Sequence, residues 1–395
     1  MRTRRLFYED VYIKEFEAIV LSCEEREGRF YTILNETAFY PEGGGQPADK
    51  GTIENEKVLD VQYIDGELYH ITKNPFEEGS QVVGRIDWDW RFDLMQQHSG
   101  EHIVSGMIHE KYGYENVGFH MGEEVITIDL SGMLTWEQVM EIERKVNAYI
   151  WMNQKVNIFY PDERQRKFIP YRSKKELTGE IRLVEFPGAD LCACCGLHVT
   201  HASQIGLVKI LSCKKFREGV RMEMLSGKRA LEYLSESAAQ NSKVAVSLSV
   251  KESETEGAVE RLLKEVYDLK GQLTQEKQKN FEAKALACMD KGNVFLIEND
   301  MEAVEVRKCT DAILDTCGGI AVLFAGNDEN GYKYATGQRN GDVREFVKQL
   351  NSQLDGRGGG KPFFAQGSVK ATKKEIESFF KKVSEDKERE FIYIG

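Results

Sequence analysis

The sequence contains no apolar run long enough to cross a membrane as a helix, which needs about 20 consecutive residues. No signal peptide is expected either, because the segment 1–10 becomes acidic at Glu9 and Asp10 before an apolar core could begin. The 395 residues are enough for two or three domains. We therefore expect a cytoplasmic protein.

Cysteine is too clustered for a disulfide framework. The chain has eight, and three of them lie together at Cys192, Cys194 and Cys195 beside His198. Such a cluster is typical of metal binding in a reducing compartment. The chain also lacks excess positive charge, since its net charge is −12. This acidity argues against a protein that coats nucleic acid indiscriminately.

The overall acidity does not exclude a local basic surface. Two segments are rich in lysine and arginine and carry few acids. Each is either an ordinary solvated surface or a binding face, and the sequence leaves both readings open. The first segment contains Arg164, Arg166, Lys167, Arg172, Lys174 and Lys175, and the second contains Lys214, Lys215, Arg217, Arg221, Lys228 and Arg229.

Two histidines lie in the middle of a predicted helix over residues 91–109. Residues four apart project from the same face of a helix, so His98 and His102 can bind one metal ion. Alone, this pair would be weak evidence. Far downstream, Cys194 and His198 have the same spacing. The two pairs together supply the four ligands of a tetrahedral zinc site, and cysteine and histidine favour zinc over harder ions.

The residues around these four leave some alternatives open. Cys194 is the preferred thiolate because of its spacing, although Cys192 or Cys195 would replace it if the loop register differed. Glu101 is expected to point away from the face that the two helical histidines share, so no side-chain base is assigned. The expected hydrogen-bond partners of the imidazoles are Asp93 and Gln97.

Residues 1–90 alternate apolar and polar positions between glycine and Asn/Asp turns, which predicts a small β-barrel domain. Within it, Gly43, Gly44 and Gly45 precede Gln46. Three glycines leave the backbone bare, so that it can approach a ligand closely. A flexible turn is the alternative, but the flanking prolines, aromatics and amide favour a ligand contact.

Three further regions follow, and together they predict an α+β protein. Residues 91–230 read as helix, strand, helix, strand, which favours an α+β metal-binding core. Residues 231–291 carry a short heptad seam that predicts a helical hairpin or a dimer contact. Residues 292–395 alternate strands and helices as in a small α/β domain. Its glycine run is either a phosphate-binding nest or a plain loop and comprises Gly358, Gly359, Gly360 and Lys361.

These motifs resemble those of the freestanding alanyl-tRNA editing proteins, the AlaX family, and of the editing half of alanyl-tRNA synthetase. The resemblance extends from about residue 5 to the end of the chain, and no segment resembles the aminoacylation core of the synthetase. The motifs stand in the family's order: Phe39-Tyr40 with Gly44-Gly45-Gln46, His98 with His102, Cys194 with His198-Val199, Arg221-Met222-Glu223 with Gly227, and Gly358-Gly359-Gly360-Lys361-Pro362.

The resemblance implies hydrolysis of the ester that joins a wrong amino acid, chiefly serine and secondarily glycine, to alanine tRNA. It also implies a zinc cofactor, tRNA as the partner and a homodimer through the helical and C-terminal regions. Editing requires a polar partner for the serine hydroxyl. The candidate substrate-binding residues are Gly43, Gly44, Gly45, Gln46, Asn116, Gly118 and Thr127. The candidate tRNA-binding residues are the first basic segment and the run Gly358, Gly359, Gly360 and Lys361.

The task of the zinc is the open question. Four protein ligands are typical of a closed structural site, whereas catalytic zinc usually keeps one position free. We expect the ion to position the substrate with partial polarisation of the ester. The main alternative is a non-catalytic tRNA-binding protein whose zinc only holds the fold. A phosphoesterase is disfavoured because the chain has no Asp-His-His motif. A peptide release factor would rest on Gly44-Gly45-Gln46 alone.

Overall fold

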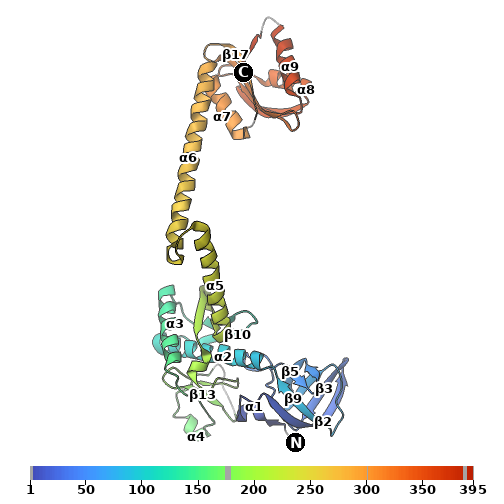
Figure 1. The fold of residues 1–395 in the computed structure, drawn as a ribbon, viewed down its shortest axis with the longest axis vertical. Coiled ribbons are helices and arrows are strands. Elements are labelled where there is room, and N and C mark those ends of the chain that lie inside the picture. Colours follow the sequence, from blue (N-terminus) through green and yellow to red (C-terminus); the bar gives the residue numbers. More distant parts are fainter. Residues whose placement is uncertain (1–2, 174–178, 300, 386–388, 395) are drawn as a thin grey trace. The chain divides into compact units, whose positions relative to one another are not determined.

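The computed structural model describes residues 3–173, 179–299, 301–385 and 389–394 (Figure 1). The chain divides into two compact units, Met1–Lys243 and Val244–Gly395. Both units mix helices with sheets, which confirms the α+β class. In the described ranges, no helix is long and apolar enough to cross a membrane. The predicted boundaries of the barrel, the metal-binding core, the hairpin and the C-terminal domain remain predictions.

The first unit begins with a seven-stranded antiparallel sheet whose two edges nearly meet. Its edge strands β6 and β7 are joined by Leu59 alone, and the Leu59 amide donates to the Ile71 carbonyl at 2.7 Å. Alternate residues of β2 are buried, as the sequence pattern predicted. The strand order is β6 (Glu56–Val58), β5 (Gly51–Ile53), β9 (Gln81–Ile86), β2 (Glu15–Arg26), β3 (Arg29–Leu34), β8 (Glu67–Thr72) and β7 (Asp60–Ile64).

Three short elements lie beside this sheet. Strand β1 (Arg4–Arg5) pairs in parallel with β4 (Glu36–Thr37), and α1 (Leu6–Glu9) follows β1 directly. The predicted glycine segment lies between β4 and β5. These elements bring Leu6 and Phe7 into one hydrophobic core with Phe39 and Tyr40, which precede the glycines.

Helix α2 (Trp88–Tyr112) starts beside the N-terminal sheet and carries the two predicted metal ligands (Figure 1). The Asp87 side chain caps its start by accepting from the Trp90 amide at 3.2 Å. Its central turns are buried almost all around, unlike a surface helix with one apolar stripe. Polar side chains on this stretch therefore face the interior of the protein, where each needs a partner.

Two smaller antiparallel sheets surround α2. The first has four strands, in the order β10 (Asn116–Met121), β11 (Ile126–Leu130), β16 (Gly219–Ser226) and β15 (Val208–Phe216). The second has three, in the order β12 (Asn157–Phe159), β13 (Leu183–Phe186) and β14 (Asp190–Ala193). The remaining helices of this part are α3 (Trp136–Trp151), α4 (Glu163–Arg166) and the 3₁₀ turn η1 (Ala202–Ile205).

The second unit contains a six-stranded mixed sheet with helices packed on it. The helical segment before it comprises α5 (Gly227–Leu248), the 3₁₀ turn η2 (Glu252–Glu254) and α6 (Thr255–Ala287). The strand order is β20 (Gly356–Lys361), β21 (Phe364–Val369), β19 (Gly331–Gly337), β18 (Gly318–Asn327), β17 (Gly292–Glu298) and β22 (Phe391–Tyr393). Its helices are α7 (Ala303–Leu314), α8 (Arg344–Gln353) and α9 (Lys373–Glu385).

The glycine run near the C-terminus is an edge strand, which corrects the prediction of a nest or loop. It forms β20 and pairs antiparallel with β21, with Gly358 opposite Gly367. A side chain at Gly358 would place its Cβ 2.5 Å from the Tyr334 hydroxyl oxygen. Glycine is therefore required by close packing at this edge, and the backbone is extended.

Candidate active site

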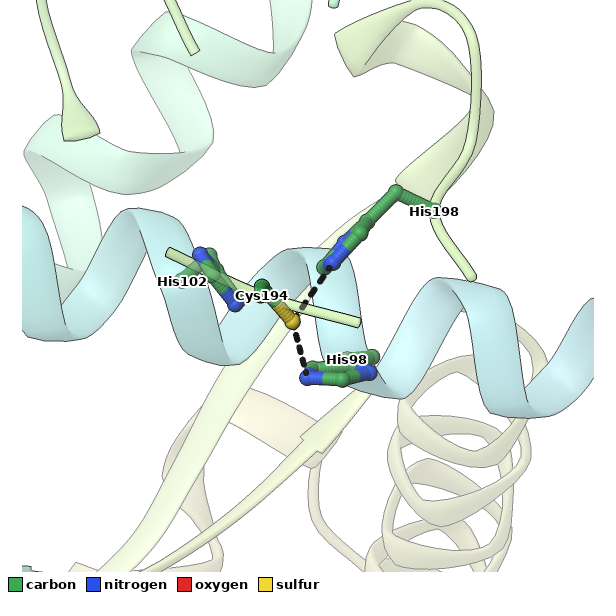
Figure 2. A group of neighbouring side chains, drawn as sticks. All are labelled: His98, His102, Cys194 and His198. Carbon is green, nitrogen blue, oxygen red and sulfur yellow. Dashed lines mark hydrogen bonds between the residues drawn. The ribbon is translucent and has the colours of Figure 1, made fainter. Parts of the chain in front are cut away.

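The four predicted metal ligands come together in the interior of the first unit. Their ligand atoms all lie within 4.8 Å of one another (Figure 2). His98 and His102 project from α2, and Cys194 and His198 follow strand β14. The Sγ of Cys194 lies 3.5 Å from Nε2 of His98 and 3.4 Å from Nε2 of His198. Two segments about 100 residues apart thus form one donor set, at a spacing that a tetrahedral ion would fill.

Each imidazole of the cluster is held by a polar group on its outer nitrogen, Nδ1. An amide or carboxylate oxygen can only accept there, so it places the proton on Nδ1 and leaves the Nε2 lone pair free for a metal. The amide of Gln46 is itself fixed, because its Oε1 also accepts from the Leu197 amide at 3.0 Å. The outer pairs are His98 with Gln46 Oε1 at 2.9 Å, His102 with Asp190 Oδ2 at 2.8 Å, and His198 with Ser99 Oγ at 3.2 Å.

The expected partners of the imidazoles, Asp93 and Gln97, were wrong. Gln97 donates to the Ser226 carbonyl at 2.8 Å, and Asp93 forms an ion pair with Arg229 at 2.6 Å. Both residues therefore tie α2 to strand β16 and helix α5. The error arose because outer partners are set by packing between distant segments.

The electrostatics of the cluster prepare Cys194 and His198 for metal binding, whereas the raised pKa of His102 favours its protonated ring. Burial raises the pKa of the Cys194 thiol, but His98 and His102 outweigh it and hold the pKa well below its ordinary value. Burial and the neighbouring imidazoles hold the pKa of His198 well below its usual range, so its ring is neutral. Burial lowers the pKa of His102, yet Cys194 and Asp190 raise it well above its ordinary value. A proton therefore competes with a metal ion at His102.

Of the three neighbouring cysteines, Cys194 is the best suited to bind metal. Cys192 lies in a second compact group with His102 and Asp190, but burial raises its pKa to about 11, so the thiol keeps its proton. Cys195 is exposed as a whole residue, but its thiol is partly buried, and this burial raises the pKa of the thiol as well. Of the two forms of a cysteine side chain, only the thiolate is a strong zinc ligand.

Asp190 is a functional residue that sequence reasoning missed. It accepts from His102 and also from Arg172 Nε at 2.7 Å, which fixes the carboxylate. The signal was available, because Asp190 and Cys192 alternate along β14 and so lie on one face of the strand beside the predicted ligands.

Glu101 lies nearer to the site than expected. It is buried and lines the same cavity as His98 and His102. Its Oε1 accepts from the hydroxyl of Ser105 at 2.6 Å and from the amide of Asn116 at 2.5 Å. Asn116, a predicted substrate contact, is a buried partner of this carboxylate. The wall of the cavity therefore does contain a carboxylate.

A cavity of about 650 Å³ opens beside the cluster of predicted metal ligands. Three predicted substrate-binding residues line it, namely Gly44, Gly45 and Gly118, whereas Gly43, Thr127 and Asn116 are not among its lining residues. Gln46 is not among the lining residues either and lies behind His98, whose Nδ1 it contacts at 2.9 Å. Gly45 has a φ of +86°, and a Cβ there would lie 2.8 Å from the Phe119 ring, which stacks on His98 at 5.4 Å. A larger residue at 45 would therefore disturb the wall.

The predicted basic face is smaller in the structure than in the sequence. Arg172 belongs to the cavity, with its side chain only 12% exposed and paired with Asp190. Arg166 is also largely covered, whereas Arg164 and Lys167 are exposed. Lys174 and Lys175 lie outside the described residues.

Three family models match parts of the chain. The model for class II (A) tRNA synthetases matches residues 7–90, which include the glycine segment. The model described as the threonyl and alanyl tRNA synthetase second additional domain matches residues 181–222, which include Cys194 and His198. The DHHA1 domain model matches residues 290–388 of the second unit.

Curated relatives match almost the whole chain. The alanyl-tRNA editing protein Aarsd1-B of Xenopus laevis is 30% identical over 403 residues, which cover 95% of this chain and 96% of the relative. This chain belongs to the alanyl-tRNA editing proteins. The family member AlaX-L of Pyrococcus horikoshii is 29% identical over 94% of this chain and 96% of its own. The alanine–tRNA ligase of Ignicoccus hospitalis is 30% identical over 91% of this chain, which spans only 40% of the ligase.

Proposed function

We propose that the protein is a zinc-dependent deacylase that hydrolyses seryl-tRNA, and secondarily glycyl-tRNA, made on alanine tRNA. The observation that carries this proposal is the cavity lined by His98, His102 and Cys194, whose ligand atoms converge with that of His198. Its volume falls within the range of about 300–1,000 Å³ typical of small-molecule sites, enough for an aminoacylated nucleoside. The relatives are named alanyl-tRNA editing proteins, which supports an editing reaction on this tRNA but names no amino acid.

The donor set fits zinc. It offers one thiol with a lowered pKa and three imidazoles whose outer nitrogens have polar partners, the combination expected of a zinc site whose ligands are held in place. Zinc bound there would supply a Lewis acid that can polarise the ester carbonyl or hold the substrate's amino group. Harder ions such as magnesium would disfavour a sulfur ligand.

The chain's own residues would orient and enclose the substrate. The backbone at Gly44, Gly45 and Gly118 lines the cavity, so the esterified amino acid can approach it closely. Glu101, held by Ser105 and Asn116, is our candidate for holding the attacking water and accepting its proton.

We also propose tRNA contacts at the exposed Arg164 and Lys167 and at the edge strand β20, and a homodimer through α6. The exposed apolar seam of α6 supports the second point, since a lone seam gains stability from a partner helix. This seam comprises Val259, Leu262, Val266, Leu269 and Leu273.

Hydrolysis of seryl-tRNA and alanyl-tRNA, both made on alanine tRNA, tests the proposal directly. We expect rapid release of serine and at least about a hundredfold slower release of alanine, because the site must recognise the hydroxyl. His109→Ala is the control variant, since His109 is a partly exposed histidine of the same helix that lies outside the cluster and pairs with Glu115 at 3.0 Å. Equal inertness toward both substrates would sink the catalytic proposal.

A non-catalytic tRNA-binding protein with structural zinc is the second candidate, favoured by the count of four protein donors. Removal of the metal with a chelator separates the two. All four tryptophans lie in the first unit, so their fluorescence reports its folding. Loss of deacylation with unchanged tryptophan fluorescence supports the deacylase, and unfolding of the unit with no activity to lose supports the alternative.

A further inference from the structure

Arg182 is a buried cation without an anion. It lines the cavity, yet the residue is only 6% exposed. Its Nη1 donates to two neutral acceptors, the carbonyls of Cys194 at 2.8 Å and Gly196 at 2.9 Å. Among the described residues, no carboxylate lies within ion-pair distance of Arg182, and its Nε has no hydrogen-bond partner. Buried charges are normally paired, so this arrangement suits an anionic ligand.

The other arginine of the cavity shows the usual arrangement. Arg172 donates from Nε to Asp190 Oδ1 at 2.7 Å, and both side chains are largely buried. The chain has 65 acidic residues against 53 basic ones, so carboxylates are plentiful. The lack of a carboxylate near Arg182 among the described residues is therefore a feature of its position and does not reflect a shortage of carboxylates in the chain.

A second arginine, Arg5, lies three residues before Tyr8, a neighbour of Arg182. The guanidinium of Arg182 lies 5.0 Å from the centroid of the Tyr8 ring, whose hydroxyl donates to the Cys195 carbonyl at 2.8 Å. Burial raises the pKa of Tyr8, and the charges of Arg182 and Arg5 both oppose this rise. Arg5 donates to the Tyr63 hydroxyl at 2.9 Å and, within the described ranges, forms no ion pair.

We propose that Arg182, assisted by Arg5, binds the phosphate that links the terminal nucleoside of the tRNA to the preceding nucleotide. The inference rests on the proposed function. In an aminoacylated 3′ end, the amino group is cationic and the ester is neutral, so the nearest anion to the reacting bond is this phosphate. The planar guanidinium of arginine matches phosphate oxygens well, and its hydrogen bonds to them are charge-assisted.

A purely structural role for Arg182 is the competing explanation. Its two bonds to the Cys194 and Gly196 carbonyls hold the backbone that carries a metal ligand. A structural role would act equally on every substrate and would alter zinc content. Phosphate binding would act only on substrates that carry the phosphate.

Two minimal substrates separate these roles. They are 3′-O-seryl-adenosine, which has no phosphate, and the same ester of adenosine 5′-monophosphate. We expect the wild-type protein to hydrolyse the phosphorylated ester with a kcat/KM about ten- to a hundredfold higher. Arg182→Met should remove most of this preference at unchanged zinc content, Arg182→Lys should restore part of it, and Arg5→Met should reduce it by a smaller factor.

Arg85→Met is the matched control, because Arg85 is half exposed on the N-terminal sheet and already paired with Glu15 at 2.8 Å. It should keep the full preference. The wild-type measurement decides the matter even if Arg182→Met fails to fold, since equal hydrolysis of both esters would overturn the inference and leave the proposed function standing. Equal loss on both esters in a folded Arg182→Met variant would also overturn it. Inactivity of the wild type toward both esters and toward seryl-tRNA would overturn the proposed function and the inference together.

Discussion

The buried His70 and the three buried histidines of the metal-ligand cluster differ in how many of their ring nitrogens have a firm hydrogen-bond partner. His70, in the N-terminal sheet, has a partner on each ring nitrogen: Nδ1 donates to the Thr32 carbonyl at 3.2 Å, and Nε2 accepts from the Thr37 hydroxyl at 2.8 Å. The histidines of the cluster have a firm partner only on the outer nitrogen, and His98 and His198 direct the inner one at the Cys194 sulfur. A ring with two partners is complete without a ligand, whereas a ring with one is prepared for a metal.

The largest expected effect comes from replacing one histidine of each kind, His102 in the cluster and His70 in the sheet, with glutamine. His102→Gln should abolish stoichiometric zinc and reduce deacylation of seryl-tRNA by more than about a hundredfold, since even outer partners of a ligand contribute 10- to 100-fold. His70→Gln should lower stability but keep one zinc per folded chain. Elemental analysis and the deacylation assay measure both. Stoichiometric zinc in His102→Gln would show that the comparison assigns the wrong ligand.

The next effect is a pH dependence of stability at His70. Burial lowers the pKa of its ring to about 4, from 6.5 in the unfolded chain. The unfolded state therefore binds the proton first as the pH falls, so the contribution is complete above pH 6.5 and is lost between pH 6.5 and about 4. At 1.36 kcal/mol per pKa unit, the loss amounts to about 3 kcal/mol.

Urea unfolding followed by tryptophan fluorescence reports on this unit alone. The quantity to compare is the change in unfolding free energy between pH 7 and pH 4.5, in the wild type and in His70→Gln, because carboxylates contribute equally to both. The variant should be less stable at pH 7 and lose less on acidification. Parallel curves for the two proteins would refute the assignment of His70 as a neutral structural ring.

Gln46 tests the outer half of the comparison. Gln46→Met keeps the size of the side chain but removes the acceptor of His98 Nδ1, so zinc affinity should fall by about 10- to 100-fold. Gln62→Met is the matched control, because Gln62 bonds to Asp60 in the N-terminal sheet and lies outside the site. Equal zinc affinity in the two variants would mean that the amide does not orient the ring.

The sequence predicted the inner part of the site better than its surroundings. The spacing of His98 and His102 on one helix, and of Cys194 and His198, is local, so a one-dimensional pattern contains it. The partners on the outer nitrogens are not local, since Gln46 precedes His98 by 52 residues. Such contacts depend on how the N-terminal sheet packs against α2, which no spacing encodes.

The fold shows the same division. Alternation along β2 followed from the sequence, because its buried apolar positions repeat with the period of a strand. The helix predicted over residues 91–109 lies within α2. The direction of Glu101 did not follow, because α2 is buried around most of its circumference and periodicity cannot rank its faces. The glycine run of β20 carries no side chains to alternate, so a strand there looks like a loop until its pairing with β21 is known.

The smallest expected effect is at the weakest outer partner. Ser99 Oγ lies 3.2 Å from His198 Nδ1 and also accepts from the Val199 amide at 3.2 Å, so it is a shared neutral group where His102 has a carboxylate. This contact is longer than the 2.9 Å contact between Gln46 Oε1 and His98 Nδ1, so Ser99→Ala should weaken zinc binding by less than about tenfold. Competition with a chelating indicator of known affinity measures this against Gln46→Met. A larger loss at Ser99 than at Gln46 would reverse the order of outer partners, and the ring of His198 would then depend on its neighbour more than that of His98 does.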